Sequence, residues 1–208
     1  MFDSSDNSLI DKLVAALRFL PGVGPKSAQR LAYYLLQHGK NKGLLLAKVL
    51  DEAIHNVSHC RRCHTLSEFE LCKICSNPKR DSALLCIVES PIDVLAIEQT
   101  ASYNGFYFVL MGHLSPLDGV GPNEIGIADL LKLLLDKAGV VQEIILATNP
   151  TVEGEATAHY ITGLVKEKYA KTIILTRIAH GIPMGSELEY IDTNTLMKAI
   201  SGRVSIDE

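Results

Sequence analysis

The stretch CRRCHTLSEFELCKIC, residues 60–75, contains two Cys-x-x-Cys motifs separated by eight residues. Each motif forms a turn that directs two thiolates toward one point, and a tetrahedral shell of four sulfur ligands is typical of zinc. We therefore predict one structural Zn²⁺, because protein ligands fill all four positions. Its binding should supply the folding energy of a segment that is too short to have its own core. The predicted ligands are Cys60, Cys63, Cys72 and Cys75.

Other interpretations of this stretch stay open. His59 and His64 flank the cysteines and could replace a thiolate as a ligand. A redox site would also use Cys-x-x-Cys motifs. The basic residues Arg61, Arg62 and Lys73 either offset the negative charge of the thiolates or contact DNA.

The cysteine-rich stretch separates two regions of opposite charge. Residues 1–80 contain 12 Lys and Arg against 7 Asp and Glu, whereas residues 81–208 contain 8 against 17. This division suggests two modules with different partners. The formal net charge of −4 argues against a uniformly basic nucleic-acid-binding protein.

Apolar residues at helical spacing precede the cysteines. They predict an amphipathic helix over about 8–20, which Pro21 ends, and a second helix from Pro25 to about Gln37. A further stripe predicts a third helix, and its members are Leu46, Leu50, Ile54 and Val57.

The connection between the first two helices is LPGVGPKSAQR, residues 20–30. Gly22 and Gly24 would let backbone N–H groups approach a ligand closely, at the positive end of the second helix. Lys26 and Arg30 are four residues apart, so they share one helix face and can reach adjacent phosphates. The stretch resembles the helix-hairpin-helix motif of DNA repair proteins, which binds the DNA backbone without reading sequence. The alternative is a plain helix corner with solvated charges.

Beyond residue 80, short apolar runs alternate with helical patterns, which predicts crossover units on a mostly parallel sheet. Cys86 lies within the first predicted strand and is expected to be a core residue. The predicted strands cover 84–88, 106–111, 144–147 and 172–176, and the predicted helices cover 91–99, 127–137 and 155–169. A last helix follows Asp192-Thr193, with Asp192 as a candidate N-cap.

Acidic residues follow two of these strands. Glu89 closes the first strand, and Glu153 and Glu155 follow the third, so the carboxylates should gather at one sheet edge, where Asp93 could join them. They could hold Mg²⁺, take a basic partner or face solvent. The spacing resembles the Toprim domain of primases, topoisomerases and related nucleases, in which one Glu and a later acidic pair bind metal. This chain departs from the usual Asp-x-Asp pair.

Composition fits an ordinary globular protein, with 47% hydrophobic and 21% charged residues. No apolar run approaches the roughly 20 residues that span a bilayer. Residues 1–8 are polar and lack the basic start of a signal peptide. We therefore expect a cytoplasmic, nucleoid-associated protein.

Taken together, the motifs resemble the RecR family of bacterial recombination mediators. The match includes LPGVGPKSAQR and also LSPLDGVGP (114–122), ATNPTVEGEAT (147–157) and GSELEY (185–190). Some members have a second acidic residue after Glu89, where this chain has Ser90. Gly119-Val120-Gly121 could suggest nucleotide binding, but a Walker A string is not present.

The resemblance implies a non-enzymatic protein that forms ring-shaped homo-oligomers. It would act with RecO and RecF to help load RecA onto single-stranded DNA coated by SSB. Lys26 and Arg30 match the DNA-contacting positions of the family, and Glu153 and Glu155 match its RecO-contacting surface. The alternative is a Toprim enzyme that cuts or primes DNA with Mg²⁺.

The expected fold is α+β and modular. It comprises a helix-hairpin-helix DNA-binding domain (1–57), a four-cysteine zinc finger (58–80), an α/β Toprim domain with a mostly parallel sheet (81–178) and a C-terminal helical assembly segment (179–208).

Overall fold

The computed structural model describes residues 8–137, 139–169, 172–179 and 181–203. The chain divides into two compact units, Met1–Val57 and Ser58–Glu208. The polar N-terminal stretch up to residue 7 and the end of the expected C-terminal segment, 204–208, lie outside the described residues.

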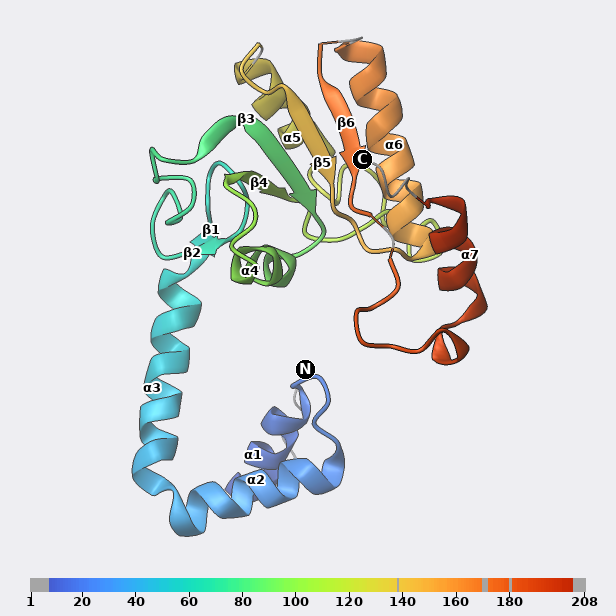
Figure 1. Cartoon of the computed structure of the whole chain (residues 1–208). Coiled ribbons are helices and arrows are strands. Elements are labelled where there is room, and N and C mark those ends of the chain that lie inside the picture. Colours follow the sequence, from blue (N-terminus) through green and yellow to red (C-terminus); the bar gives the residue numbers. More distant parts are fainter. Residues whose placement is uncertain (1–7, 138, 170–171, 180, 204–208) are drawn as a thin grey trace. The chain divides into compact units, whose positions relative to one another are not determined.

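The first unit contains α1 (Leu9–Arg18), α2 (Pro25–His38) and α3 (Lys40–Asn56). Figure 1 shows α1 lying along α2, where the fully buried Ala28 and Ala32 allow close helix packing. Ser8 and Asp11 cap the start of α1 reciprocally. The third helix begins well before its predicted apolar stripe, and that stripe is exposed in the single chain: Leu46 is 55% and Ile54 69% exposed.

The second unit is built on a four-stranded parallel sheet with the strand order β4-β3-β5-β6. The strands are β3 (Asp81–Val88), β4 (Gly105–Val109), β5 (Glu143–Leu146) and β6 (Ile174–Arg177). The helices between them are α4 (Pro91–Gln99), α5 (Ile127–Asp136) and α6 (Val152–Lys168). The predicted α/β arrangement is therefore confirmed.

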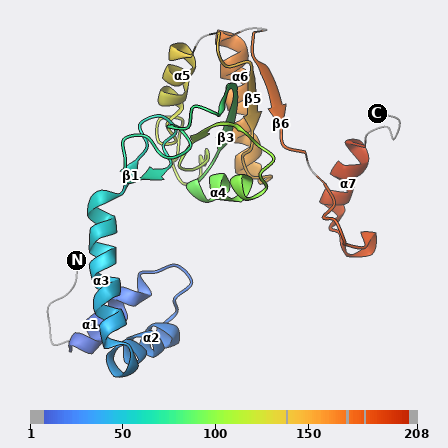
Figure 2. The same ribbon diagram turned by 60° about the vertical axis from the view of Figure 1, so that its left-hand side comes forward.

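Alternation along β3 supplies two cores, one on each face of the sheet. Leu85 and Ile87 pack with residues of α5 and α6, whereas Cys86 and Val88 pack with Val94 of α4. Figure 2 shows α5 and α6 beside the strands of the sheet. Cys86 is thus the core residue that the sequence predicts.

Two short strands, β1 (Ser58–His59) and β2 (Leu66–Ser67), pair antiparallel at the start of this unit. The cysteines 60, 63, 72 and 75 belong to the same buried cluster as Leu85 and Ile87. The cysteine segment therefore packs on the sheet.

After β6, the described residues contain the short 3₁₀ helix η1 (Leu188–Tyr190) and α7 (Thr193–Ser201). Asp192 caps α7 by accepting hydrogen bonds from Asn194 N and Thr195 N, which confirms the predicted N-cap. No helix in the described ranges is both long enough and apolar enough to cross a membrane.

One predicted boundary matters for the acidic residues. The sequence placed the start of a helix at Glu155, but α6 begins at Val152. The reason is Thr151, whose hydroxyl accepts a hydrogen bond from Gly154 N and so caps the helix three residues earlier. Glu153 and Glu155 consequently lie in the first turn of α6.

Candidate metal centre, hairpin and acidic edge

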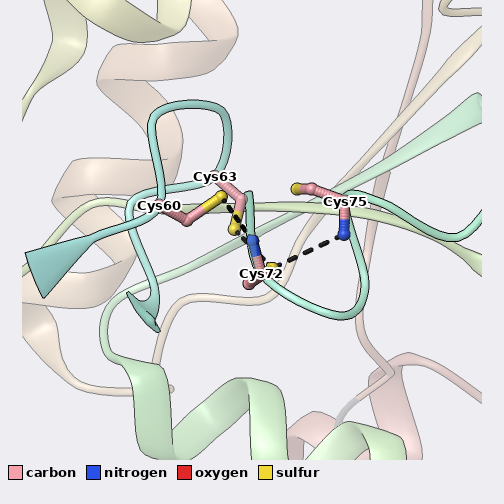
Figure 3. Close-up of side chains that lie close together, drawn as sticks. All are labelled: Cys60, Cys63, Cys72 and Cys75. Atoms are coloured by element: carbon pink, nitrogen blue, oxygen red, sulfur yellow. Dashed lines mark hydrogen bonds between the residues drawn. The ribbon is translucent and has the colours of Figure 1, made fainter. Parts of the chain in front are cut away.

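The four sulfur atoms of Cys60, Cys63, Cys72 and Cys75 lie within 4.8 Å of one another, and all four residues are buried (Figure 3). Across the described ranges they form the only group of three or more His, Cys, Asp or Glu side chains this close together. Backbone N–H groups point at the sulfurs: Cys72 N donates to Cys60 Sγ at 3.3 Å, and Cys75 N to Cys72 Sγ at 3.5 Å. Such bonds stabilise thiolates, so the donor set fits zinc.

The thiols also interact with one another. Hydrogen bonds from the Cys63 and Cys75 thiols lower the pKa of Cys72. Hydrogen bonds with the Cys63 and Cys72 thiols, together with burial, raise the pKa of Cys75, and the bond with Cys72 raises the pKa of Cys63. A zinc ion would replace this shared protonation by binding all four as thiolates.

The two histidines that could have replaced a thiolate point elsewhere. His59 Nδ1 lies 2.9 Å from the carbonyl oxygen of His64. The ring of His64 packs on Phe108, with 4.7 Å between centroids. Neither histidine belongs to the four-residue group.

The cysteine segment is attached to the edge strand β4. Val109 N donates to the carbonyl oxygen of Cys63 at 2.9 Å. The guanidinium of Arg62 lies 3.8 Å above the ring of Phe106, and Arg61 pairs with Glu70 at 2.7 Å. These two arginines are therefore held by an aromatic ring and a carboxylate, respectively.

The hairpin between α1 and α2 has the geometry expected of a close-approach loop. Gly22 has a φ of +77°, a conformation that favours glycine. Gly24 is the N-cap of α2, and no side chain caps that helix start, so its first N–H groups lack a side-chain partner. Lys26 and Arg30 are exposed on α2.

The acidic residues meet at the carboxyl ends of the strands, but protein groups hold two of them. Glu89 is 5% exposed and accepts hydrogen bonds from Asn149 N at 2.8 Å and Asn149 Nδ2 at 2.7 Å. His113 Nδ1 lies 3.3 Å from the same carboxylate. Arg177 pairs with Glu155 at 2.8 Å.

Asp93, which could have joined these carboxylates, is engaged within its own helix start. Its carboxylate accepts hydrogen bonds from the N–H and hydroxyl of Ser90, both at 2.8 Å, and so caps α4. Ser90 thus has a local structural role at the position after Glu89.

Three polar residues of this edge were missed by sequence reasoning: Asn149, His113 and Arg177. Asn149 lies two residues after the predicted strand 144–147, which was a usable signal. Arg177 and His113 carried none, because only the fold brings them within reach of Glu155 and Glu89.

Comparisons with known proteins agree with this modular arrangement. Family models match residues 10–54 (RecR, helix-hairpin-helix), 57–77 (RecR, four-cysteine zinc finger domain), 83–179 (Toprim domain) and 181–204 (RecR, C-terminal). The Recombination protein RecR of Coxiella burnetii (strain RSA 493 / Nine Mile phase I) is 53% identical over 201 residues, which is 96% of this chain and 98% of that protein.

The chain belongs to the RecR family. Membership of the RecR family places it in recombination and DNA repair, with a helix-hairpin-helix, a four-cysteine zinc finger and a Toprim domain. The zinc finger model and the observed cysteine cluster together support zinc as the metal.

Proposed function

We propose that this chain is a non-enzymatic DNA-binding mediator of recombination. It would act with RecO and RecF to help load RecA onto single-stranded DNA coated by SSB. Membership of the RecR family supports the recombination role. The DNA-binding part of the proposal rests on the hairpin of the first unit.

The observation that carries DNA binding is at Gly24. Its backbone is extended, with φ −75° and ψ 171°, a conformation that any residue can adopt. A Cβ added there would meet nothing within 4 Å. No contact within the described chain therefore requires glycine, whereas a closely approaching phosphodiester would. With Gly22 and the uncapped start of α2, it forms a loop suited to an anion.

Lys26 and Arg30 would hold the phosphates next to this loop. Both side chains are exposed, and neither makes an ion pair or side-chain hydrogen bond with any described residue. Contacts of this kind are to backbone, so the predicted binding is independent of sequence.

The contacts at the acidic edge favour a binding surface for a partner protein and argue against a Mg²⁺ site. Glu89 already accepts two hydrogen bonds from Asn149, and Glu155 is paired with Arg177. Glu153 stays available in the first turn of α6. We propose that Glu153 and Glu155 contact RecO, and that Cys60, Cys63, Cys72 and Cys75 hold a structural zinc ion.

Assembly into a ring-shaped homo-oligomer is supported by exposed apolar side chains. Leu44 and Leu45 of α3 are 72% and 61% exposed, and Met197 and Ile200 of α7 are each 58% exposed. Surfaces of this kind mark protein interfaces.

The direct test is a RecA-loading assay on SSB-coated single-stranded DNA with RecO and RecF. The wild-type chain should accelerate loading, and Lys26→Ala with Arg30→Ala should remove the acceleration. Metal-dependent nuclease and primase assays run on the same preparation test the alternative. Mg²⁺-dependent cleavage or priming that is lost with Glu89→Gln would overturn the non-enzymatic proposal.

A further inference from the structure

One face of α2 borders an open groove of about 570 Å³. The groove lies within the first unit and includes Arg30, one of the proposed phosphate contacts. Six polar or aromatic residues line it: Ser27, Arg30, Tyr33, Tyr34, Gln37 and His38.

The polar groups of this groove have no protein partner among the described residues. None of its side chains makes a hydrogen bond or ion pair with another residue in that part of the chain. The sequence of α2, PKSAQRLAYYLLQH, contains Lys26 and Arg30 but no Asp or Glu. A ligand of this face is therefore expected to be anionic.

The same face carries aromatic rings in an unusual setting. Tyr33 and Tyr34 are 49% and 54% exposed, although large aromatic side chains normally gain stability by burial. The ring of Tyr34 lies beside that of His38, with 6.1 Å between their centroids. The two ring planes are inclined by 52°, so each ring offers its own face at the surface.

Helical spacing aligns the ring of Tyr34 with the proposed phosphate contact at Arg30. Arg30, Tyr34 and His38 are each four residues apart, so they follow one line along α2 with about 5–6 Å between neighbouring Cβ atoms. One nucleotide can therefore place its phosphate at Arg30 and its base on the ring of Tyr34.

We propose that this face of α2 binds single-stranded DNA by stacking a base on Tyr34. The inference rests on the proposed DNA binding by Lys26 and Arg30 and adds a preference for single strands. In a duplex the base faces are already stacked on one another, so an aromatic ring gains nothing there. Stacking is tolerant of sequence, because every base has a flat face.

The test compares the affinities of the full chain for three DNA probes of equal length: oligo-dT, an abasic single strand and a duplex. Tyr34→Leu should weaken oligo-dT binding by about 5-fold to 100-fold and leave duplex binding unchanged. Tyr34→Phe keeps the ring and should bind like the wild type. Tyr160→Leu, at a 37% exposed tyrosine of α6, is the matched control.

The abasic probe adds a wild-type comparison that does not depend on how well any variant folds. It keeps the phosphates but removes the bases, so the wild type should bind it more weakly than oligo-dT, and Tyr34→Leu should bind both equally. The chain has no Trp, so quenching of tyrosine emission by oligo-dT gives a second readout.

Several outcomes would overturn the inference. Equal affinity of the wild type for oligo-dT and the abasic strand would exclude stacking while leaving the proposed DNA binding intact. Suppose that Tyr34→Leu weakens binding of oligo-dT and of duplex DNA equally and also has a smaller mass in solution. That result would show that this face is an interface between copies of the chain. No binding of any DNA by the wild type would instead refute the proposed function itself.

Discussion

The backbone N–H of Val109 donates a hydrogen bond of 2.9 Å to the carbonyl oxygen of Cys63, which joins a predicted zinc ligand directly to the last residue of the edge strand β4. An edge strand has unpaired backbone groups that must be covered. The cysteine segment covers this one, and Arg62 and His64 pack on Phe106 and Phe108 of the same strand. Zinc binding and sheet stability should therefore be coupled.

That coupling gives the first prediction. Cys63→Ser should lower the free energy of unfolding by more than about 4 kcal/mol, because it removes a metal ligand and loosens the cover of β4. Zinc analysis and thermal unfolding of the full chain check this. Cys86→Ala is the control: Cys86 lies outside the group, so that variant should keep one zinc per chain. Equal zinc content in Cys63→Ser and the wild type would contradict the assignment.

Two glycines of α6 should respond oppositely to alanine. A Cβ at Gly154 would lie 2.1 Å from the carbonyl oxygen of Asn149 and 2.7 Å from Glu89 Oε1, so Gly154→Ala should cost at least about 2 kcal/mol. A Cβ at Gly163 would meet nothing within 4 Å, so Gly163→Ala should stabilise the helix by about 0.5–1 kcal/mol. Chemical denaturation of both variants measures the difference. Unchanged stability of Gly154→Ala would show that α6 does not pack against Asn149 and Glu89 as described, and destabilisation by Gly163→Ala would contradict the open space at that position.

The pH dependence of stability should include Glu98. Arg80 hydrogen-bonds the Glu98 carboxylate and lowers its pKa, and Tyr107 donates to it at 2.7 Å. A carboxyl group with a lowered pKa stabilises the fold at pH values above its unfolded pKa of about 4.3, and this contribution disappears as pH falls through the folded pKa. Glu98→Gln should therefore cost about 1–3 kcal/mol at pH 7 and progressively less below about pH 4. A pH-independent difference between the two proteins would refute this explanation.

Salt dependence should reveal how many hairpins bind DNA at once. Two phosphate contacts, from Lys26 and Arg30, predict a log–log slope of about −2 on duplex DNA, and four hairpins acting together predict roughly −7. Lys26→Ala with Arg30→Ala should flatten the slope without changing the mass in solution. Leu50→Glu, on the exposed stripe of α3, should lower the mass and flatten the slope together. Equal slopes for the wild type and Leu50→Glu would mean that assembly does not create the DNA site.

Charge reversal on α6 tests the proposed partner surface. Glu153→Lys with Glu155→Lys should abolish RecO binding while DNA binding survives. Glu153→Lys alone is the sharper variant, because Glu155→Lys also breaks the ion pair with Arg177 and should lower stability. Glu167→Lys, further along the same helix, is the control. If the double variant retains RecO binding and instead loses a Mg²⁺-dependent activity, the enzyme alternative holds.

Spacing along the chain was enough to predict much of this protein. The two Cys-x-x-Cys motifs predicted a cluster that the fold indeed assembles, since turns within a few residues fix where the thiols point. Helical periodicity located α1, α2 and α5 to within a few residues, because an apolar face repeats along the sequence with the period of the helix.

Only the tertiary structure decided the acidic edge and the place of the cysteine segment. Arg177 is 22 residues from its partner Glu155, and Asn149 is 60 from Glu89, so no local pattern records either contact. The hydrogen bond between Val109 and Cys63 likewise depends on β4 becoming an edge strand. Local geometry follows from neighbouring residues, whereas contacts between polar groups far apart in the sequence follow from the spatial order of the strands in the sheet.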